Sequence, residues 1–296
     1  MISPETAAPA KPPHQRVAWP KALLVMAHPD DEYALAATTY RITREIGGLA
    51  DHVVVTNGEG GYRYASLAET VYGIAIARER DGRANLPAIR KQETINAGRI
   101  LGIRDHYFLD QTDLGFTGRC ADASCADWDW VRIRTALAGL LKRESYDFVF
   151  TLLPREDAHG HHRAVALFVR GAVAELDEER RPVVLGAEAA QTEEDSYPFA
   201  GLPDHPLTRA ASLAPAFSFN RNKGFGHNVA LTYQIIANWV IAEHKSQGLF
   251  QTDHGRHDAE RFWAFAITPR AGERAGELAR RVLHSTAEVA SLCSSL

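Results

Sequence analysis

The chain has 296 residues, of which 33 are Lys or Arg and 37 are Asp or Glu, so its formal net charge is −4. This near balance excludes a protein that binds nucleic acid mainly through electrostatic attraction. Hydrophobic residues make up 45% of the chain, yet no run approaches the ~20 apolar residues of a membrane span, and the N-terminal segment lacks the apolar core of a secretory signal. We therefore expect a cytoplasmic globular protein with no stable membrane anchor and no nucleic-acid partner.

The three cysteines, Cys120, Cys125 and Cys293, are too few for a disulfide framework, and their odd number leaves at least one thiol free. Cys120 and Cys125 lie close together in CADASC. Because structural zinc takes four ligands and no second cysteine pair is present, we interpret them as loop thiols.

The first half of the chain alternates between apolar runs and amphipathic stretches. Residues 1–20 are rich in Ala and Pro without periodicity and predict a flexible arm. We expect residues 21–296 to form a single domain. In chain order, the patterns then predict a strand at 21–27, a helix at 33–46, a strand at 52–56, a glycine loop at 57–61, helices at 66–79 and 88–101, and a strand at 106–109.

The second half continues the same alternation. It predicts a helix at 128–142, a strand at 147–153, a helix at 163–176, a strand at 182–185, loops over 187–227, a helix at 228–243, an edge strand at 261–268 and a closing helix at 271–292. Strands and helices at this spacing indicate βαβ units. The expected fold class is α/β: a Rossmann-like, mostly parallel sheet flanked by helices, with loop-rich C-terminal additions.

A first polar cluster, AHPDDE, directly follows the predicted strand 21–27. It contains one imidazole, His28, and two carboxylates, Asp30 and Asp31. His28 and Asp31 are three residues apart at a strand-to-helix turn, where two such side chains can converge on one point. Two aspartates after a strand can also serve only as a helix N-cap. The cluster by itself supplies half of a metal site.

A second cluster, DAHGHH, follows the predicted strand 147–153 and supplies three imidazoles, His159, His161 and His162. The carboxyl ends of parallel strands meet at one edge of a sheet, so we expect both clusters to lie on the same rim. One further ligand from the second cluster completes the three-ligand set of a catalytic zinc. The pair of clusters therefore indicates metal chemistry.

These clusters are part of a wider set of motifs that resembles the PIG-L or LmbE-like family of zinc-dependent de-N-acetylases. The motifs are AHPDDE, Arg90-x-x-Glu93 ahead of Ala97 and Leu101-Gly102, His159-x-x-His162, and a late HKSQ at 244–247. AHPDDE is the most specific of them. The resemblance spans about residues 21–250 in the expected order.

The resemblance implies a zinc-dependent hydrolase that removes an acetyl group from an N-acetylated amino sugar or its conjugate, through attack of a metal-activated water on the acetamide carbonyl. By similarity, His28, Asp31 and His162 bind Zn²⁺ or another divalent transition metal. Asp30 is then the general base, and His159 is the acid and oxyanion stabiliser. General chemistry agrees, since a carboxylate accepts the proton of such a water and an imidazole stabilises an oxyanion.

The chain departs from the family at one position. The family reads H-P-D-H where this chain has His159-Gly160-His161-His162. His161 therefore replaces the aspartate that is expected to orient the acid histidine. Loss of this aspartate is expected either to lower the pKa of His159 or to leave the orienting role to Asp157. His161 is in addition a competing candidate for the metal.

Two further positions have both a functional and a structural interpretation. Arg90 matches the family position that contacts polar groups of the substrate, but it is also compatible with a surface charge on a helix. His244 in HKSQ follows a partly buried helix and either lines the pocket or serves the core. The glycine loop at 57–61 is a weak nucleotide motif, because the dinucleotide fingerprint belongs after the first strand.

Several rival functions remain at this stage. One is an amidase that acts on a larger sugar-thiol conjugate with the same metal chemistry, and another is a non-catalytic sugar- or metal-binding protein on the same scaffold. A nucleotide-binding Rossmann protein ranks third, because the glycine motif is missing. The sequence leaves the exact substrate open, and it leaves open whether the chain is a homo-oligomer.

Overall fold

The computed structural model describes residues 20–116, 128–192, 197–253 and 256–284. The expected arm at 1–20, apart from its last residue, lies outside this part of the chain, as do Cys120, Cys125 and Cys293. No helix in the described residues combines the length and the apolar character that crossing a bilayer requires.

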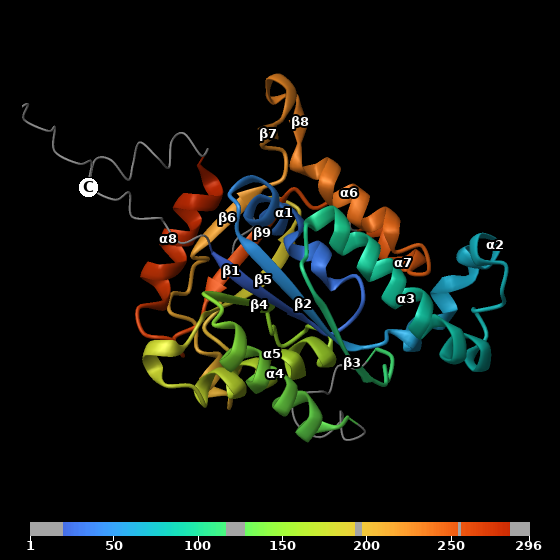
Figure 1. Ribbon diagram of the computed structural model, residues 1–296, viewed down its shortest axis with the longest axis horizontal. Coiled ribbons are helices and arrows are strands. Elements are labelled where there is room, and N and C mark those ends of the chain that lie inside the picture. Colours follow the sequence, from blue (N-terminus) through green and yellow to red (C-terminus); the bar gives the residue numbers. More distant parts are fainter. Residues whose placement is uncertain (1–19, 117–127, 193–196, 254–255, 285–296) are drawn as a thin grey trace, which may run out of the picture.

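A seven-stranded sheet with the order β3-β2-β1-β4-β5-β9-β6 forms the centre of the molecule (Figure 1). Its strands are β1 (Lys21–Met26), β2 (Leu49–Thr56), β3 (His106–Gln111), β4 (Phe148–Leu152), β5 (Val183–Ala190), β6 (Phe217–Asn220) and β9 (Ala259–Ala264). The pairs among β1 to β5 are parallel, whereas β9 runs antiparallel to both of its neighbours. The expected α/β fold with a mostly parallel sheet is confirmed.

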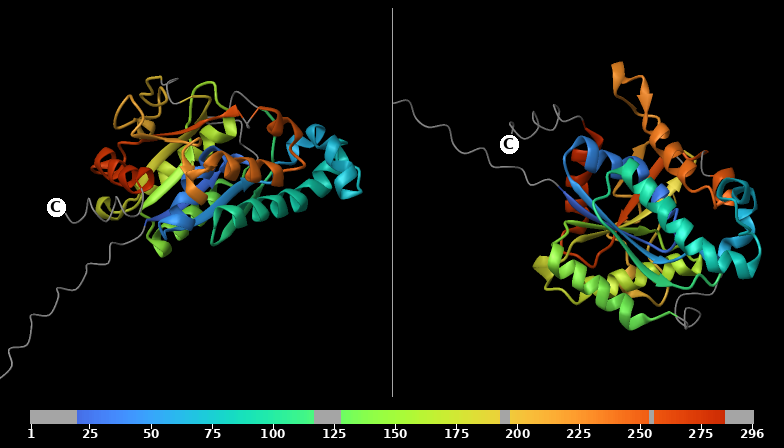
Figure 2. Two further views of the ribbon diagram at one scale, coloured as in Figure 1. Left: turned by 90° about the horizontal axis from the view of Figure 1, so that it is seen from above. Right: turned by 45° about the vertical axis from the view of Figure 1, so that its right-hand side comes forward.

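Helices cover both faces of this sheet, as Figure 2 shows from two further directions. The α-helices are α1 (Ala36–Tyr40), α2 (Glu69–Tyr72), α3 (Glu79–Leu101), α4 (Trp130–Glu144), α5 (Gly160–Ala174), α6 (Tyr233–Glu243), α7 (Gly248–Asp253) and α8 (Ala271–Leu283). Helices α4 and α5 pack on one face. The segment around α1 packs on the other face together with α8, and α3 and α6 pack against α1.

The alternation of side chains in β1 shows why a continuous apolar run forms this strand. Leu23 and Val25 belong to the core under α4 and α5, whereas Leu24 and Met26 belong to the core on the opposite face. Because helices cover both faces, every second residue meets a different apolar layer, and a central parallel strand therefore shows no polar alternation.

The strand order places a topological switch point between β1 and β4. Strands β2 and β3 extend the sheet on the β1 side, and β5 extends it on the β4 side. The connections that leave β1 and β4 therefore turn to opposite faces of the sheet, which opens a crevice above their carboxyl ends. Both polar clusters of the sequence begin at this crevice.

The C-terminal third of the sheet differs from expectation. The strand expected at 182–185 continues to Ala190 as β5, and the segment 187–227, expected to be loops, contains β6 and the first strand of a hairpin formed by β7 (Gly224–Phe225) and β8 (Leu231–Thr232). The strand expected at the edge is β9, which lies inside the sheet between β5 and β6. These pairings join segments far apart in sequence, so local periodicity does not report them.

Several helix boundaries also differ. The helix expected at 66–79 ends at Tyr72, because Gly73 adopts the left-handed conformation with φ of 69° that terminates helices. Helix α3 begins at Glu79, nine residues before its expected start, and contains Pro87. The helix expected at 228–243 begins at Tyr233, after the β7-β8 hairpin, and α7 was not expected.

Buried histidine His52 on β2 has neither ring nitrogen hydrogen-bonded within the described chain. Burial lowers the pKa of His52 from 6.5 to about 4. Between pH 6.5 and pH 4, His52 is therefore protonated in the unfolded chain and neutral in the folded chain. The neutral His52 ring therefore contributes to the free energy of unfolding fully above pH 6.5, and this contribution is lost as the pH falls towards 4. The loss is about 3 kcal/mol.

We expect His52→Leu to lose stability less steeply on acidification than the wild type, because leucine binds no proton. Urea denaturation at pH 6.5 and pH 4 measures the free energy of unfolding of both proteins. Between pH 6.5 and pH 4, the free energy of unfolding of the wild type should fall by about 3 kcal/mol more than that of His52→Leu. The exposed His227→Leu serves as the control and should follow the wild type. An equal decline in His52→Leu and wild type would contradict this assignment.

Candidate metal centre and hydrolytic site

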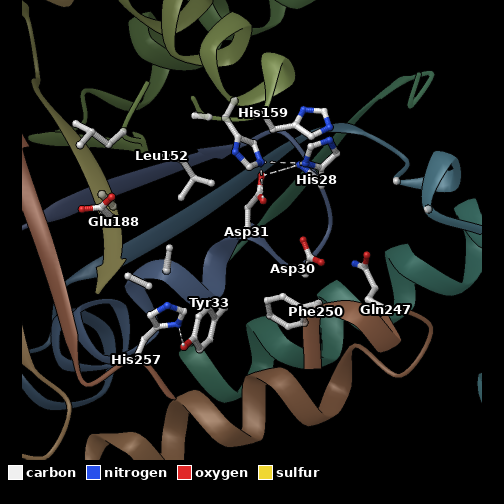
Figure 3. A pocket seen from close by; sticks show the side chains of 18 of the residues that line it. His28, Asp30, Asp31, Tyr33, Leu152, His159, Glu188, Gln247, Phe250 and His257 are labelled. Atoms are coloured by element: carbon white, nitrogen blue, oxygen red, sulfur yellow. Dashed lines mark hydrogen bonds and ion pairs between the residues drawn. The ribbon is translucent and has the colours of Figure 1, made fainter. Parts of the chain in front are cut away.

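A cavity of about 710 Å³ opens at the carboxyl edge of the sheet. Its walls come from the segments that follow β1, β2, β3 and β4, together with the last residues of β5 and the region around α7. Figure 3 shows His28, Asp31 and His159 gathered at one end of this cavity. The rim predicted from the strand order is therefore where the polar clusters lie.

Asp31 is held in place by the turn that follows β1. Its Oδ2 accepts hydrogen bonds from the backbone N–H groups of Ala27 and His28, each at 2.9 Å. Asp30, the preceding residue, has a φ of 106°, a conformation that costs energy for a residue other than glycine. The strained turn directs two successive carboxylates to one end of the cavity.

Three ligand atoms converge at this end. His28 Nδ1 lies 3.1 Å from His162 Nε2 and 3.6 Å from Asp31 Oδ2, and His162 Nε2 lies 3.1 Å from Asp31 Oδ1. Ligands bound at about 2.0–2.2 Å around a tetrahedral zinc stand roughly 3.3–3.5 Å apart. These separations bracket that range, so the donor set fits a divalent transition metal.

The two aspartates of the turn have pKa values shifted in opposite directions. Burial alone would raise the pKa of Asp31, but the contacts with His162 and His28 hold the pKa of this carboxyl well below its ordinary value. For Asp30, burial and the neighbouring charge of Asp31 both raise the pKa well above its ordinary value. Two adjacent carboxyls thus have opposite tendencies, one to stay ionised and one to take up a proton.

The turn that carries Asp30 is supported by a buried ion pair. Glu32 Oε2 accepts a hydrogen bond from the backbone N–H of Asp30 at 3.0 Å, and Glu32 Oε1 lies 2.7 Å from His244 Nε2. Both Glu32 and His244 are fully buried. His244 therefore contacts the back of the turn and does not line the cavity, in line with the structural interpretation of HKSQ.

His159 occupies the N-cap of α5, directly after the loop that leaves β4. Its Nδ1 accepts a hydrogen bond from the backbone N–H of His161 at 3.0 Å. Burial, followed by the charges of His28 and His162, lowers the pKa of His159 to about 3. A neutral ring that accepts at Nδ1 carries its hydrogen on Nε2, so His159 is an N–H donor rather than a cation.

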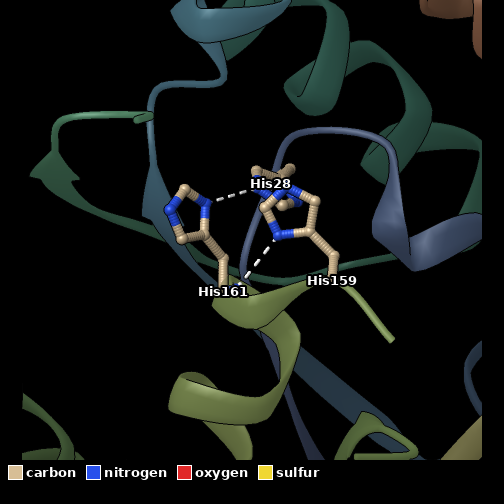
Figure 4. Close-up of side chains that lie close together, drawn as sticks. All are labelled: His28, His159 and His161. Atoms are coloured by element: carbon tan, nitrogen blue, oxygen red, sulfur yellow. Dashed lines mark hydrogen bonds between the residues drawn. The ribbon is translucent and has the colours of Figure 1, made fainter. Parts of the chain in front are cut away.

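His161 lies behind His28 and does not join the ligand set formed with Asp31. Figure 4 shows its ring next to those of His28 and His159. His161 Nδ1 lies 2.9 Å from His28 Nε2, the nitrogen of His28 that faces away from Asp31, and the ring is fully buried against Trp128. His28, His159 and His161 also form a second group whose ligand atoms lie within 4.8 Å of one another.

Among the described residues, the hydrogen-bond partner of the Asp157 carboxylate is Arg155 and not His159. The two oxygens of this carboxylate accept hydrogen bonds from the guanidinium of Arg155 at 2.8 and 2.6 Å. The carboxylate nearest to His161 comes from Asp113, whose Oδ1 lies 3.6 Å from His161 Nδ1. The alternative in which Asp157 orients the acid histidine therefore has no support in this geometry.

Arg90 is buried, so its interpretation as a surface charge is wrong. It lines the cavity, but its guanidinium donates to the backbone carbonyls of Gly58, Gly61 and Ser246 and to the Ser246 hydroxyl. The left-handed Gly58, with φ of 72°, lies close to this guanidinium, and an added Cβ would come within 3.0 Å of it. Arg90 thus ties the loop after β2 to the segment before α7.

Sequence reasoning missed several residues that line the cavity. They are Tyr33, Asp113, Glu188, Gln247, Phe250 and His257. Asp113 had a usable signal, because it follows the carboxyl end of β3 as the two clusters follow β1 and β4. Gln247 also had a signal, because it is the last residue of the HKSQ motif. The others have none, since they come from the unexpected extension of β5, from the unexpected α7 and from isolated positions.

Comparisons with known proteins agree with this arrangement. The chain is 25% identical over 162 residues to a probable N-acetyl-alpha-D-glucosaminyl L-malate deacetylase 2 from Bacillus cereus. The match covers 55% of this chain and 64% of the relative, so it spans less than two thirds of the relative's length. The solved structure of the A40926 pseudoaglycone deacetylase superposes with a TM-score of 0.53 at 14% identity, covering 84% of this chain and 98% of that one. A triple mutant of a deacetylase from the teicoplanin biosynthetic pathway gives a TM-score of 0.50 at 14% identity, with coverages of 83% and 98%. At these identities the two structures establish the fold alone.

A family model described as PIG-L: GlcNAc-PI de-N-acetylase matches residues 23–173. This range is just over half of the chain and includes β1 from Leu23 onwards, β2 to β4, the AHPDDE turn and the histidines at the start of α5. The strands and turns that build the metal-ligand cluster are thus those that the model describes, and the chain belongs to the PIG-L family.

Proposed function

We propose that this protein is a zinc-dependent hydrolase that removes an acetyl group from an N-acetylated amino sugar or a small conjugate of one. The observation that carries the proposal is the convergence of His28 Nδ1, His162 Nε2 and Asp31 at one end of a cavity. Two imidazoles and a carboxylate form a donor set typical of catalytic zinc. Membership of a de-N-acetylase family supports the reaction type.

Zinc bound by such a set supplies a Lewis acid and lowers the pKa of water towards about 7. In the proposed reaction Asp30 accepts a proton from the attacking water, a role that suits its raised pKa. The water oxygen forms a bond to the acetamide carbonyl carbon. The C–N bond then breaks, and acetate and a free amine leave.

His159 is proposed to stabilise the oxyanion that develops on the carbonyl oxygen. Its Nδ1 accepts a backbone hydrogen bond, so its Nε2–H is the group available as donor. A neutral histidine at a helix N-terminus can polarise a carbonyl in this way. Because such a ring is a weak acid, we assign the return of the proton to the leaving amine to Asp30 rather than to His159.

Asp31→Ala should abolish metal binding, because it removes one of three ligands and leaves two imidazoles. Elemental analysis should find about one zinc per chain in the wild type and none in the variant. The matched control is Glu156→Ala, which removes an exposed carboxylate near the same loop and should retain the zinc. Wild-type protein that lacks stoichiometric metal after purification without chelators would overturn the proposal.

Asp30→Asn should retain zinc and lose turnover, because the amide keeps the shape of the side chain and cannot accept the proton. We expect kcat for amine release from an N-acetylated sugar to fall on the order of 10²- to 10⁴-fold. Zinc content measured on the same sample separates a lost base from a lost metal. A zinc-loaded variant with wild-type kcat would show that Asp30 is not the base.

His161→Phe should weaken zinc binding about 10- to 100-fold, because His28 loses the partner of its outer nitrogen. Phenylalanine fills the space beside Trp128, so the variant tests the hydrogen bond and not the packing. His161→Asp, which restores the residue usual in the family, should stay near the wild type. Competition with a zinc chelator measures these affinities. Equal affinities in the wild type and His161→Phe would exclude this supporting role.

A further inference from the structure

The cavity extends well beyond the metal-ligand cluster. Its volume of about 710 Å³ falls in the upper part of the range of about 300–1,000 Å³ that holds drug-sized ligands. Figure 3 shows Glu188 on β5 at the side of the cavity remote from His28 and His159, with Leu152 between Glu188 and Asp31. Tyr33 and Phe250 line another wall. A substrate whose acetamide lies at the cluster thus extends towards Glu188.

Glu188 is held rigidly by its neighbours. Its Oε1 accepts hydrogen bonds from Arg155 at 2.7 Å and from the Tyr197 hydroxyl at 2.9 Å, and the Arg155 guanidinium stacks 4.8 Å from the centre of the Tyr197 ring. The Glu188 side chain is 17% exposed. Within the described residues, both hydrogen bonds to the Glu188 carboxylate are accepted by Oε1. Glu188 lines the cavity, and within the described residues its Oε2 keeps the capacity to accept a hydrogen bond from a ligand.

The charges around the cavity disfavour an anion at this end. The charged lining residues at the Glu188 end are the carboxylates Asp157 and Glu188 and the guanidinium of Arg155. The hydrogen bonds of Arg90 go to the protein backbone and Ser246, and those of Arg155 go to Asp157 and Glu188. At the Glu188 end, one guanidinium thus faces two carboxylates, which leaves a net negative charge.

We propose that Glu188, positioned by Arg155 and Tyr197, forms a subsite for an uncharged, hydroxyl-bearing group attached to the N-acetylated sugar, such as a second sugar ring. This inference rests on the proposed function and names its substrate class. A sugar hydroxyl donates to Glu188 Oε2, whereas a carboxylate or phosphate at the same place meets like charge with no unpaired guanidinium in the described lining. Glu188 on β5 and Tyr197 lie beyond the residues that the family model matches, whereas Arg155 lies within them.

The first test compares two substrates that share the acetamido sugar and differ in the attached group. These are N,N'-diacetylchitobiose, which carries a neutral sugar, and N-acetylglucosaminyl malate, which carries a dianion. We expect kcat/KM of the zinc-loaded wild type to favour the neutral disaccharide by at least about tenfold. Equal values, or a preference for the malate conjugate, would overturn the proposal.

The second test changes the charge at the subsite with Glu188→Gln, which nearly preserves the shape of the side chain. KM for diacetylchitobiose should rise about tenfold, because a hydrogen bond to a charged acceptor is lost, and KM for the malate conjugate should fall. The matched control is Glu178→Gln, an exposed carboxylate outside the cavity lining, which should leave both values unchanged. A parallel change in both substrates would show that Glu188 is only structural.

Direct binding separates failure of this inference from failure of the proposed function. Isothermal titration of the zinc-loaded Asp30→Asn variant with each conjugate reports affinity without turnover. If neither conjugate is deacetylated by the wild type but the neutral one binds more tightly, the subsite stands and the assigned reaction fails. If both are deacetylated and the malate conjugate binds equally or better, the reaction stands and the subsite fails.

Discussion

The whole site depends on the adjacency of β1 and β4 in a parallel sheet. These strands are more than one hundred residues apart in sequence, yet their pairing brings the turn after β1 next to the first turn of α5. His28 and Asp31 come from one side and His162 from the other, with ligand atoms 3.1–3.6 Å apart. Because the connections leave to opposite faces, the crevice between them stays open to a substrate.

A second layer of side chains supports this arrangement from behind. His161 contacts the outer nitrogen of His28, and Glu32, paired with buried His244, accepts a hydrogen bond from the backbone N–H of Asp30. Outer contacts of this kind orient ligands and tune their basicity. His161 is an imidazole where the resemblance leads us to expect an aspartate, and burial lowers the pKa of His161 to about 3, so it is a neutral partner. Within the described residues the carboxylate nearest to it is that of Asp113, which follows β3.

The two ends of the cavity have different chemistry, and the proposed substrate selectivity rests on their separation. The end at β1 and α5 carries the candidate ligand set, Asp30 and the His159 donor, which in our proposal act on the acetamide. The end at β5 carries a fixed carboxylate with its cation already paired. The family model covers the first end and, of the second, only the loop after β4 that carries Arg155 and Asp157. In this proposal, the residues for the reaction lie within the matched range, whereas Glu188, which is assigned to substrate choice, lies outside it.

The sequence by itself determined the α/β class, the parallel strands β1 to β4, and the two clusters AHPDDE and HGHH at their ends, because apolar runs and strand-end polar residues are local signals. Only the tertiary structure decided that Arg90 is buried, that Asp157 pairs with Arg155, and that Asp113 and Glu188 line the cavity. Only it placed β9 between β5 and β6. Burial, the choice of hydrogen-bond partner and strand order depend on contacts between segments that are distant in sequence, so local sequence patterns do not predict them.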